Sequence, residues 1–366
     1  MVALTAHDAR SGLNGEPCSP TRSKGSDAQL LVLGGGGFLG YHVVAEALQL
    51  GHEVSTFNRE GKAPLARVEA LEGDRQVVLT ALRGRSWDAV LDTFSDPDAV
   101  GETARLLSGS VGAYGYVSGI SIYHPDGPPV VDEDAPLRRP GDAAENDLLQ
   151  ERSIAKIHCE EAASRYFSGP VVTTRVGIMV GPRDPTDRFS WWPVRLARAL
   201  ADGGEILAPG DPKRPVRFSD ARDIAAWMVG MLDAGTSGTY NAVGPRRDVP
   251  IAKVLDACRI AANGEGGEEA GSVEMAWVAE EFLREQLRET PEEERPLWFP
   301  EDQIPFEKVD SSRALAAGLT FRPVYETARD TLARVRSRPG GPELGAGFSA
   351  DVERQPLNRW QHARCD

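Results

Sequence analysis

Apolar and polar residues alternate along this chain in blocks that predict strands and helices in turn. Leu30–Leu33 is a short apolar run, as expected for a buried strand, and four glycines follow it at once. Beyond Gly40, apolar side chains recur at helical spacing, at Val43, Val44, Ala47 and Leu48. The pattern therefore predicts a strand, a tight glycine turn and a helix at the start of the folded chain.

The same alternation continues towards the C-terminus. Short runs of β-branched and aromatic residues predict further strands at Glu53–Asn58, Val77–Leu82, Ala89–Asp92, Gly112–Ser118, Val171–Val180, Val216–Asp223 and Gly238–Ala242. Longer segments predict helices at Glu145–Phe167 and Ser349–His362, and at Pro250–Trp277 and Val278–Glu289 around a Gly-rich break at Gly264–Gly267. Strands that alternate with helices indicate an α/β fold with a doubly wound parallel sheet and right-handed crossovers.

Composition narrows the functional classes. The chain has 366 residues, of which 41% are hydrophobic and 26% charged, and its net charge is −14. An acidic protein is a poor nonspecific binder of nucleic acid, because neutralising phosphates needs a basic face. No apolar run is long enough to span a bilayer, and the N-terminus lacks a basic-then-apolar signal pattern. We therefore expect neither a nucleic acid nor a membrane as partner.

The cysteines indicate the compartment. Cys18, Cys159, Cys258 and Cys365 are far apart and form no C-x-x-C pair. This spacing argues against a disulfide framework or a zinc site, and it fits a reducing environment. We therefore expect a cytoplasmic protein without a metal.

The glycine turn carries the clearest chemical signal. Gly34, Gly37 and Gly40 give the spacing G-x-x-G-x-x-G between a predicted strand and a predicted helix. A pyrophosphate can sit on the N-terminal amides of a helix only where no Cβ blocks its approach. Gly34 would allow the turn, Gly37 the approach of the phosphate, and Gly40 close packing of the helix on the strand. We therefore predict that a dinucleotide binds at Gly34, Gly37, Phe38, Leu39 and Gly40; a glycine-rich surface turn is the alternative.

This spacing resembles that of the extended short-chain dehydrogenase/reductases, also called the NAD-dependent epimerase/dehydratase family. The resemblance extends from about Ala28 to about Arg334. It implies a dinucleotide-binding domain over residues 28–180, to which a segment at about 214–244 returns. It also implies a smaller C-terminal substrate domain, interleaved with the first, over residues 181–213 and 245–335.

The two ends of the chain lie outside this resemblance. Met1–Asp27 is rich in small polar residues, and we interpret it as a disordered leader. Residues 336–366 are expected to form a tail that begins with a Pro/Gly-rich stretch and ends in the helix predicted at Ser349–His362.

The end of the second predicted strand bears on which dinucleotide binds. NAD-preferring folds place an acidic residue there to accept from the ribose 2′-OH, whereas this chain has Asn58 and Arg59. The fork of an arginine suits the oxygens of a 2′-phosphate. We therefore expect Asn58 and Arg59 to contact the cofactor and NADP to be favoured, with NAD as the alternative. The simpler explanation of Arg59 is a solvated surface side chain.

The resemblance implies further contacts with the cofactor. Asp74 and Arg75 follow Gly73 where the family's aspartate accepts a hydrogen bond from the adenine amine. Thr93 and Phe94 match the segment that passes beneath the pyrophosphate and ribose. A plain turn would explain the first pair equally well, and buried packing of a strand end the second.

A later segment resembles the nicotinamide side of the family's site. Arg175-Val176-Gly177 stands where the family has Arg-Pro-Gly, which implies that Val176 and Ile178 approach the nicotinamide. Gly181-Pro182-Arg183-Asp184 matches the family's Gly-Pro turn.

The catalytic motif departs from the family pattern. The family's strand ends in Ser-Ser/Thr-x-x-Val-Tyr, and Tyr-x-x-x-Lys follows on a helix. Aligning Tyr123 puts Gly119 at the Ser/Thr position, and Arg152 stands where the second tyrosine belongs, before Lys156. The resemblance implies that Lys156 holds the nicotinamide ribose, which makes it both a cofactor and a catalytic candidate. Arginine keeps its proton at any ordinary pH, so Arg152 can supply only a fixed charge.

Three interpretations of this departure stay open. Arg152 could stabilise an oxyanion in altered chemistry; another acid, from Tyr123, His124 and Ser121, could have taken over; or catalysis has been lost. Ser118 ends the same strand. The candidate catalytic residues are therefore Lys156, Arg152, Ser121, Tyr123 and Ser118.

Together these observations predict an NADP-dependent enzyme that acts on a small carbonyl, alcohol or sugar-like substrate, as a monomer or homodimer. Phrases such as GPRDPTDRF and AAGLTFRP are similar to actinobacterial reductase-like members of the family, and several members belong to secondary metabolism. One alternative is a catalytically silent nucleotide sensor or scaffold. Another is a non-redox enzyme of elimination, epimerisation or cyclisation that retains bound cofactor.

Overall fold

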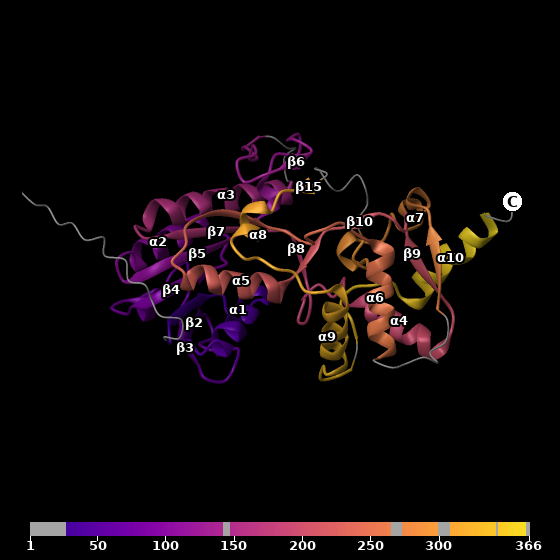
Figure 1. The fold of residues 1–366 in the computed structure, drawn as a ribbon, viewed down its shortest axis with the longest axis horizontal. Helices are drawn as coiled ribbons and strands as arrows, with labels where there is room; N and C mark the ends of the chain where they lie inside the picture. The colour runs from indigo at the N-terminus through magenta and orange to yellow at the C-terminus, as the bar shows by residue number, and fades with distance from the viewer. Residues whose placement is uncertain (1–26, 142–146, 265–272, 299–307, 342, 364–366) are drawn as a thin grey trace, which may run out of the picture.

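The chain folds into two lobes that lie side by side along the long axis of the molecule (Figure 1). The computed structural model describes residues 27–141, 147–264, 273–298, 308–341 and 343–363. All but the last residue of the predicted leader Met1–Asp27 lies outside the described residues. The first lobe is built on a large sheet, and the second is mainly helical.

A seven-stranded parallel sheet forms the first lobe, in the order β12-β7-β5-β4-β1-β2-β3. Its strands are β1 (Gln29–Leu33), β2 (Glu53–Asn58), β3 (Val68–Glu72), β4 (Trp87–Asp92), β5 (Val111–Gly119), β7 (Val171–Val176) and β12 (Gly238–Ala242). The strand order reverses between β1 and β4, and doubly wound sheets bind ligands beyond the carboxyl ends of strands at such a point. The structure therefore confirms the predicted fold class.

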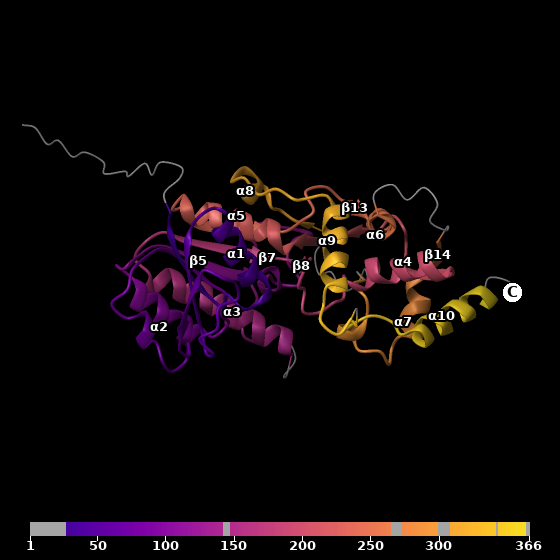
Figure 2. The same ribbon diagram turned by 90° about the horizontal axis from the view of Figure 1, so that it is seen from below.

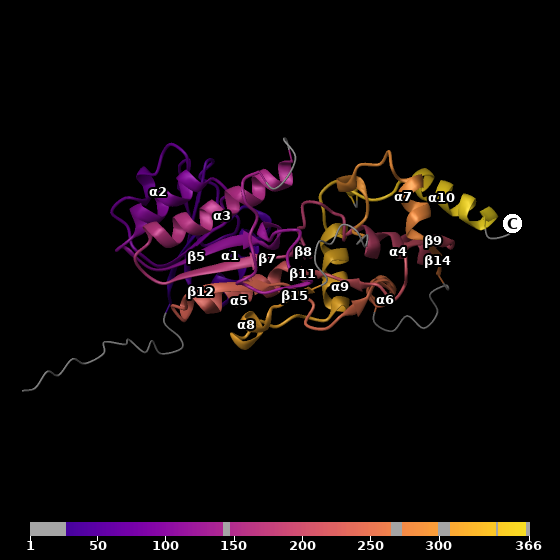
Figure 3. The same cartoon turned by 90° about the horizontal axis from the view of Figure 1, so that it is seen from above.

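Helices cover both faces of this sheet (Figure 2, Figure 3). On one face lie α1 (Phe38–Gln49) and α5 (Ala221–Asp233), and on the other α2 (Pro97–Leu107) and α3 (Leu148–Tyr166). Strand β1 packs against both pairs, because Leu30 and Val32 belong to the first core and Leu31 and Leu33 to the second. A strand that is buried on both faces needs an unbroken apolar run, as this segment provides.

The second lobe has its core among α4 (Trp191–Asp202), α6 (Ile251–Asn263) and α9 (Val324–Arg336). Beside them, β9 (Glu205–Pro209) pairs in parallel with β14 (Glu274–Val278). Helices α7 (Glu280–Gln286) and α10 (Ala350–Ala363) pack at the far end of the molecule (Figure 1). Among the described residues, no helix is both long and apolar enough to cross a membrane.

Short elements complete the two lobes. The small strand pairs are β8 (Ile178–Val180) with β11 (Phe218–Asp220), β10 (Pro215–Val216) with β13 (Val249–Pro250), and β6 (Val130–Val131) with β15 (Lys308–Val309). Three single turns of 3-10 helix occur at Thr80–Leu82, Ile120–Ile122 and Glu292–Glu294. Helix α8 (Ser312–Ala316) places Ala314 in the core of the sheet lobe, together with Leu319. This part of the predicted substrate segment 245–335 therefore packs on the sheet.

The predicted elements β2 and β12 begin and end as expected, but the strand predicted at Val77–Leu82 is wrong. The strand beside β2 is β3, at the edge of the sheet, and Val77 and Val78 are exposed. Of the five β3 residues only Leu71 is buried, so the sequence VEALE carries a weak apolar signal.

Three longer predictions are also corrected. The strand predicted at Val171–Val180 splits at Gly177, because β7 pairs within the large sheet whereas β8 pairs with β11. The segment Val216–Asp223 contains parts of β10, β11 and the first turn of α5, whose N-cap is Asp220. The helix predicted at Pro250–Trp277 ends at Asn263, and the residues from Glu274 form β14, where Ala276 and Val278 alternate as buried positions.

Candidate functional site

The glycine turn joins β1 to α1 at the carboxyl edge of the sheet. Gly34 has a φ of 98°, in the left-handed region that glycine adopts most easily. A Cβ on Gly40 would lie 2.3 Å from the Gly34 oxygen, so only glycine lets α1 approach the turn this closely. Gly36 and Gly37 are exposed, and the first turn of α1 holds no acidic residue. The turn therefore presents backbone amides at the positive end of a helix.

This geometry fits the pyrophosphate of a dinucleotide. No described atom lies within 4 Å of a Cβ built on Gly36, so the approach to the turn is open. The Gly37 N–H donates to the Gly34 oxygen at 3.0 Å, and the next backbone amides belong to Phe38, which is half-buried, and Leu39, which is buried. Phosphate contacts by these three residues stay a prediction.

At the end of β2, Asn58 is occupied by its own turn. Its Oδ1 accepts hydrogen bonds from the backbone N–H groups of Glu60 (3.2 Å) and Lys62 (3.1 Å), and its Nδ2 donates to the Lys62 oxygen (2.9 Å). Arg59 is exposed beside this turn. The turn therefore fixes the backbone from which the Arg59 cation extends.

Arg75 has a structural role, which corrects its prediction as a cofactor contact. It is only 8% exposed, and its guanidinium donates to both carboxylate oxygens of Asp92 at 2.8 and 2.7 Å. Burial alone would raise the pKa of Asp92, but the Arg75 charge and the Tyr114 hydroxyl hold it below its usual range. Asp74 remains half-buried, and its carboxylate accepts from the Gln76 N–H at 2.9 Å.

Thr93 and Phe94 lie where β4 ends, next to the glycine turn. The Thr93 hydroxyl donates to the Leu33 oxygen at 3.2 Å, and a Cβ on Gly34 would lie 2.5 Å from it. The Phe94 carbonyl accepts from the Tyr116 hydroxyl at 2.9 Å. Both residues thus support the floor of the predicted cofactor site.

Lys156 reaches this floor from α3. Its Nζ donates to the Val117 oxygen at 2.8 Å and to the Phe94 oxygen at 3.3 Å, at the ends of β5 and β4. The ammonium also lies 5.0 Å from the centre of the Tyr116 ring. Burial lowers the pKa of Lys156. The structure therefore brings Lys156 together with Thr93 and Phe94, below the carboxyl edge of the sheet.

Tyr123 is withdrawn from the site. The residue is 1% exposed; its hydroxyl donates to Asn241 Oδ1 at 2.6 Å and accepts from Arg175 Nη1 at 3.1 Å. Burial raises the pKa of this phenol. A buried hydroxyl in such a network cannot reach a substrate, so Tyr123 is corrected from candidate acid to structural residue.

Ser121 and Ser118 flank the position where the family hydroxyl is missing. A Cβ on Gly119 would lie 3.9 Å from Ser121 Oγ and 3.6 Å from the Val176 oxygen, both ordinary contacts. The half-buried Ser121 is held in a 3-10 turn, where its carbonyl accepts from Arg138 Nε at 2.7 Å. Ser118 is 2% exposed, and its Oγ has no hydrogen-bond partner among the described residues.

Arg152 lies in the first turns of α3 and is exposed, one helical turn before Lys156. Within the described ranges, no carboxylate forms an ion pair with it. His124, the other candidate acid, is half-buried, and its Nδ1 accepts from the Asp126 N–H at 3.1 Å. Arg152 is therefore the more accessible of the two.

The nicotinamide candidates lie where β7 gives way to β8. Val176 ends β7 and is half-buried, whereas Ile178 begins β8 and is 44% exposed. An exposed isoleucine beyond the carboxyl end of a sheet offers an apolar surface to a flat ring, although its contact with nicotinamide stays a prediction.

The Gly-Pro turn that follows β8 packs on α1. Its Asp184 N–H donates to the Gly181 oxygen at 3.1 Å, and His42 Nε2 lies 2.8 Å from the Pro182 oxygen. Arg183 has a φ of 74°, a left-handed conformation that costs a residue other than glycine about 1–2 kcal/mol. The surroundings of this turn therefore hold Arg183 in an unfavourable conformation.

Sequence reasoning missed the buried charges that organise the site. Arg175 is 5% exposed and donates to both Glu160 oxygens, at 3.1 and 2.8 Å, which ties β7 to α3. Asp92 likewise accepts two hydrogen bonds from the buried Arg75, which ties the end of β4 to the segment that follows β3. The available signal was a charged residue at or near the end of each strand, Arg175 in VVTTRV and Asp92 in WDAVLD.

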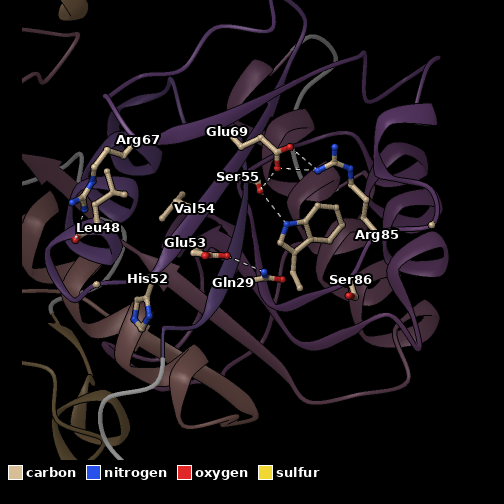
Figure 4. A pocket seen from close by; sticks show the side chains of 13 residues that line it. Gln29, Leu48, His52, Glu53, Val54, Ser55, Arg67, Glu69, Arg85 and Ser86 are labelled. Atoms are coloured by element: carbon tan, nitrogen blue, oxygen red, sulfur yellow. Dashed lines mark hydrogen bonds and ion pairs between the residues drawn. The ribbon is translucent and has the colours of Figure 1, made fainter.

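A cavity of about 690 Å³ lies at the opposite, amino ends of the strands (Figure 4). Its polar side chains bond mostly to one another: Arg85 donates to both Glu69 oxygens at 2.8 and 2.9 Å, and Ser55 donates to the same carboxylate at 2.9 Å. These groups lie at the amino edge of the sheet, whereas the glycine turn and Lys156 lie at its carboxyl edge. The cavity is therefore separate from the candidate site.

Comparisons with known proteins agree with this geometry. Residues 30–115, from β1 into β5, match the sequence profile of the NAD dependent epimerase/dehydratase family. Comparison with curated proteins gives no match.

Solved structures share the fold at low identity. An epimerase-like protein from Burkholderia cenocepacia is 17% identical, with 86% of this chain and 100% of that one covered and a TM-score of 0.60. WbmH of Bordetella bronchiseptica, solved with NAD+, is 18% identical over 85% of this chain and 98% of its own, with a TM-score of 0.56. UDP-glucuronic acid 4-epimerase of Bacillus cereus, solved with NAD, is 14% identical over 86% and 98%, with a TM-score of 0.57. Residues 30–115 are therefore similar to the NAD dependent epimerase/dehydratase family, and most of the chain shares the fold of these solved structures.

Proposed function

We propose that this chain is an NAD(P)-dependent enzyme whose dinucleotide lies across the carboxyl ends of β1, β4 and β5. The observation that carries the proposal is the pairing of an open glycine turn with Lys156. The turn offers amides to a pyrophosphate, and the Lys156 ammonium sits below the strand ends, where a ribose hydroxyl could accept from it. Residues 181–213 and 245–335 would supply much of the substrate side.

The substrate is proposed to be a small carbonyl, alcohol or sugar-like compound. When bound, the nicotinamide supplies or accepts a hydride at its C4 atom. In this chain, Ser121 Oγ lies close to the position of the missing family hydroxyl and would hold the substrate oxygen. Arg152 would stabilise negative charge on that oxygen as a fixed cation. Lys156 would keep the ribose, and with it the nicotinamide, in place.

Substrate assignment starts from a panel of ketones, aldehydes, alcohols and UDP-sugars, followed by the absorbance of NADPH and by product analysis. UDP-sugars are included because the Bacillus cereus neighbour is named for one. On a substrate that turns over, Arg152→Ala should lower turnover by about 10²–10³, the range for one oxyanion donor. Arg165→Ala, an exposed arginine at the other end of α3, is the matched control. Equal turnover in both variants would remove Arg152 from the site.

NADP is proposed as the preferred cofactor because Arg59, not an acid, extends from the turn after β2. Wild-type protein should bind NADPH more tightly than NADH. Arg59→Asp should weaken NADPH by about 1.5–3 kcal/mol, as expected for a charge-assisted hydrogen bond, and leave NADH within a few-fold. Titration of both nucleotides by calorimetry tests this, and equal wild-type affinities would reject the preference.

One observation favours a second candidate, a catalytically silent nucleotide sensor. Gly119 and Arg152 replace two catalytic groups of the family motif, and Tyr123 is buried away from the site. A sensor would bind the dinucleotide, turn over nothing on the panel, and change its affinity for a protein partner when the nucleotide is bound. Cys159 and Cys258, both buried free thiols, support a cytoplasmic location for either function.

A further inference from the structure

We propose that Arg183 binds the pyrophosphate of the dinucleotide, facing the first amides of α1 from the side of the second lobe. The inference rests on the proposed function, since it needs a dinucleotide on the glycine turn. It adds a side-chain cation to a phosphate site for which Gly34, Gly37 and Gly40 provide only backbone groups.

Arg183 occupies the third position of a tight turn, Gly181–Asp184. The hydrogen bond from Asp184 to Gly181 closes a four-residue turn with Pro182 second and Arg183 third. A turn with proline second and a positive φ third is of type II, whose third position favours glycine. An arginine in that position points to a function of its side chain, since glycine would serve the backbone better.

The side chain of Arg183 stacks on the ring of Tyr41 in α1. Its guanidinium carbon lies 3.8 Å from the centre of the Tyr41 ring, within cation–π range. Tyr41 is in the first turn of α1, where its N–H donates to the Gly37 oxygen at 2.9 Å. The His42 contact to Pro182 holds the same turn against α1. The cation is thereby kept beside the helix end on which the pyrophosphate is proposed to sit.

The charge of the Arg183 guanidinium is not balanced by an ion pair among the described residues. In the part of the chain that the structure describes, no carboxylate forms an ion pair with Arg183, although the protein carries a net charge of −14. The first turn of α1 adds no acidic residue. A cation that forms no ion pair among the described residues, next to a positive helix end, is arranged for an anion from outside the chain.

The consequence is a link between the two lobes. Arg183 belongs to the turn that leads from β8 into the second lobe, whereas Tyr41 belongs to α1 of the sheet lobe. A phosphate held by Arg183 and by the first amides of α1 would fix the Gly181–Asp184 turn. Binding of the dinucleotide would then position the start of the segment proposed to contact the substrate.

The test uses ADP-ribose, which has the pyrophosphate but no 2′-phosphate, together with NADPH. Calorimetry at low and high salt compares wild type with Arg183→Gly and Arg183→Lys, and thermal unfolding is measured on the same proteins without ligand. Arg183→Gly should bind both ligands about tenfold more weakly, with a shallower salt dependence, yet unfold at the same or a higher temperature. Arg183→Lys should lie between the two in affinity.

Arg105→Ala is the matched control, because Arg105 stacks on Tyr166 at 4.0 Å in α2, far along the chain from the glycine turn. It should bind ADP-ribose as wild type does. The proposal is overturned if Arg183→Gly binds ADP-ribose normally, if it loses affinity and unfolds at a lower temperature, or if Arg105→Ala weakens binding equally. Wild type that binds neither NADPH, NADH nor ADP-ribose would instead reject the proposed function itself.

Discussion

At the scale of single residues, the candidate site holds two cations in different ways. Arg75 is buried with a full counter-charge, since Asp92 accepts two hydrogen bonds from it. The Lys156 ammonium donates to three backbone oxygens, of Val117 at 2.8 Å, Phe94 at 3.3 Å and Thr93 at 3.4 Å, and burial lowers its pKa. A buried pair is a fixed part of the fold, whereas the long hydrogen bonds from Lys156 to the Phe94 and Thr93 oxygens can be exchanged for one to a bound hydroxyl.

This difference predicts the behaviour of Lys156→Met. NADPH binding should weaken about tenfold or more, from the loss of one charge-assisted hydrogen bond. Stability without ligand should stay equal or rise, because the lowered pKa means that the folded state disfavours the charged lysine. Calorimetry and urea unfolding check both, with the exposed Lys213→Met as control.

The pH dependence of stability gives an independent check on Lys156. Between its lowered folded pKa and the ordinary value of 10.5, the unfolded chain binds more protons than the folded protein. Stability should therefore rise with pH across that window in wild type, and this contribution should be missing from Lys156→Met. A variant that follows the wild-type profile would contradict the burial of the ammonium.

At the scale of elements, two glycines of the turn should have different roles, Gly37 in binding the cofactor and Gly40 in folding. Gly37 has a φ of −73°, and a Cβ there would lie 3.3 Å from the Gly34 oxygen, a tight but adjustable contact. Gly37→Val should therefore fold and yet bind NADPH at least a hundredfold more weakly, because its side chain stands in the phosphate approach. Gly40→Val, with its Cβ 2.3 Å from backbone, should instead fail to fold stably. Circular dichroism and calorimetry distinguish the two, and normal binding by Gly37→Val would show that the turn holds no phosphate.

The predictability of each element depended on how it is buried. β1 is covered on both faces, so Leu30–Leu33 shows in the sequence as a plain apolar run. β3 buries one residue of five, and β14 buries only Ala276 and Val278 in a run of five residues, so both patterns are too short to stand out. The glycine turn and Lys156 were predictable because each lies in a motif whose residues are separated by a fixed number of positions. The burial of Tyr123 and Arg75 was not, since it depends on Asn241 and Asp92, which are distant in sequence.

At the scale of the whole molecule, an ion network around the buried Asp220 joins the two lobes. Asp220 accepts from Arg222 at 2.7 Å and from the Thr327 hydroxyl at 2.9 Å, and Arg222 also donates to Asp330 at 2.6 Å. Arg222 lies in α5 of the sheet lobe, whereas Thr327 and Asp330 lie in α9 of the second lobe. The network therefore fixes how the lobes face each other across the site.

Breaking this network predicts a measurable loss of stability. Asp220→Asn should lower the free energy of unfolding by about 3 kcal/mol, because it removes the buried carboxylate that accepts two hydrogen bonds from Arg222 and leaves that cation only its pair with the half-buried Asp330. Burial alone would raise the pKa of Asp220, but Arg222 and Arg322 hold it below 3.8, so its stabilisation is present above that pH and is lost on acidification through the lowered pKa. Urea unfolding from neutral to acidic pH tests this. The control is Asp351→Asn, which removes an exposed ion pair with Arg354 and should change the free energy of unfolding by less than about 0.5 kcal/mol.

The position of β12 has a consequence for how the protein is made. This edge strand pairs with β7, yet the ribosome synthesises α4, β9 and α5 between the two. A nascent chain that has just released β7 therefore carries an open sheet edge until Ala242 emerges, and open edges pair with one another. A gene fragment that stops at Val180 would make that state permanent, so the truncated protein should aggregate when it is expressed.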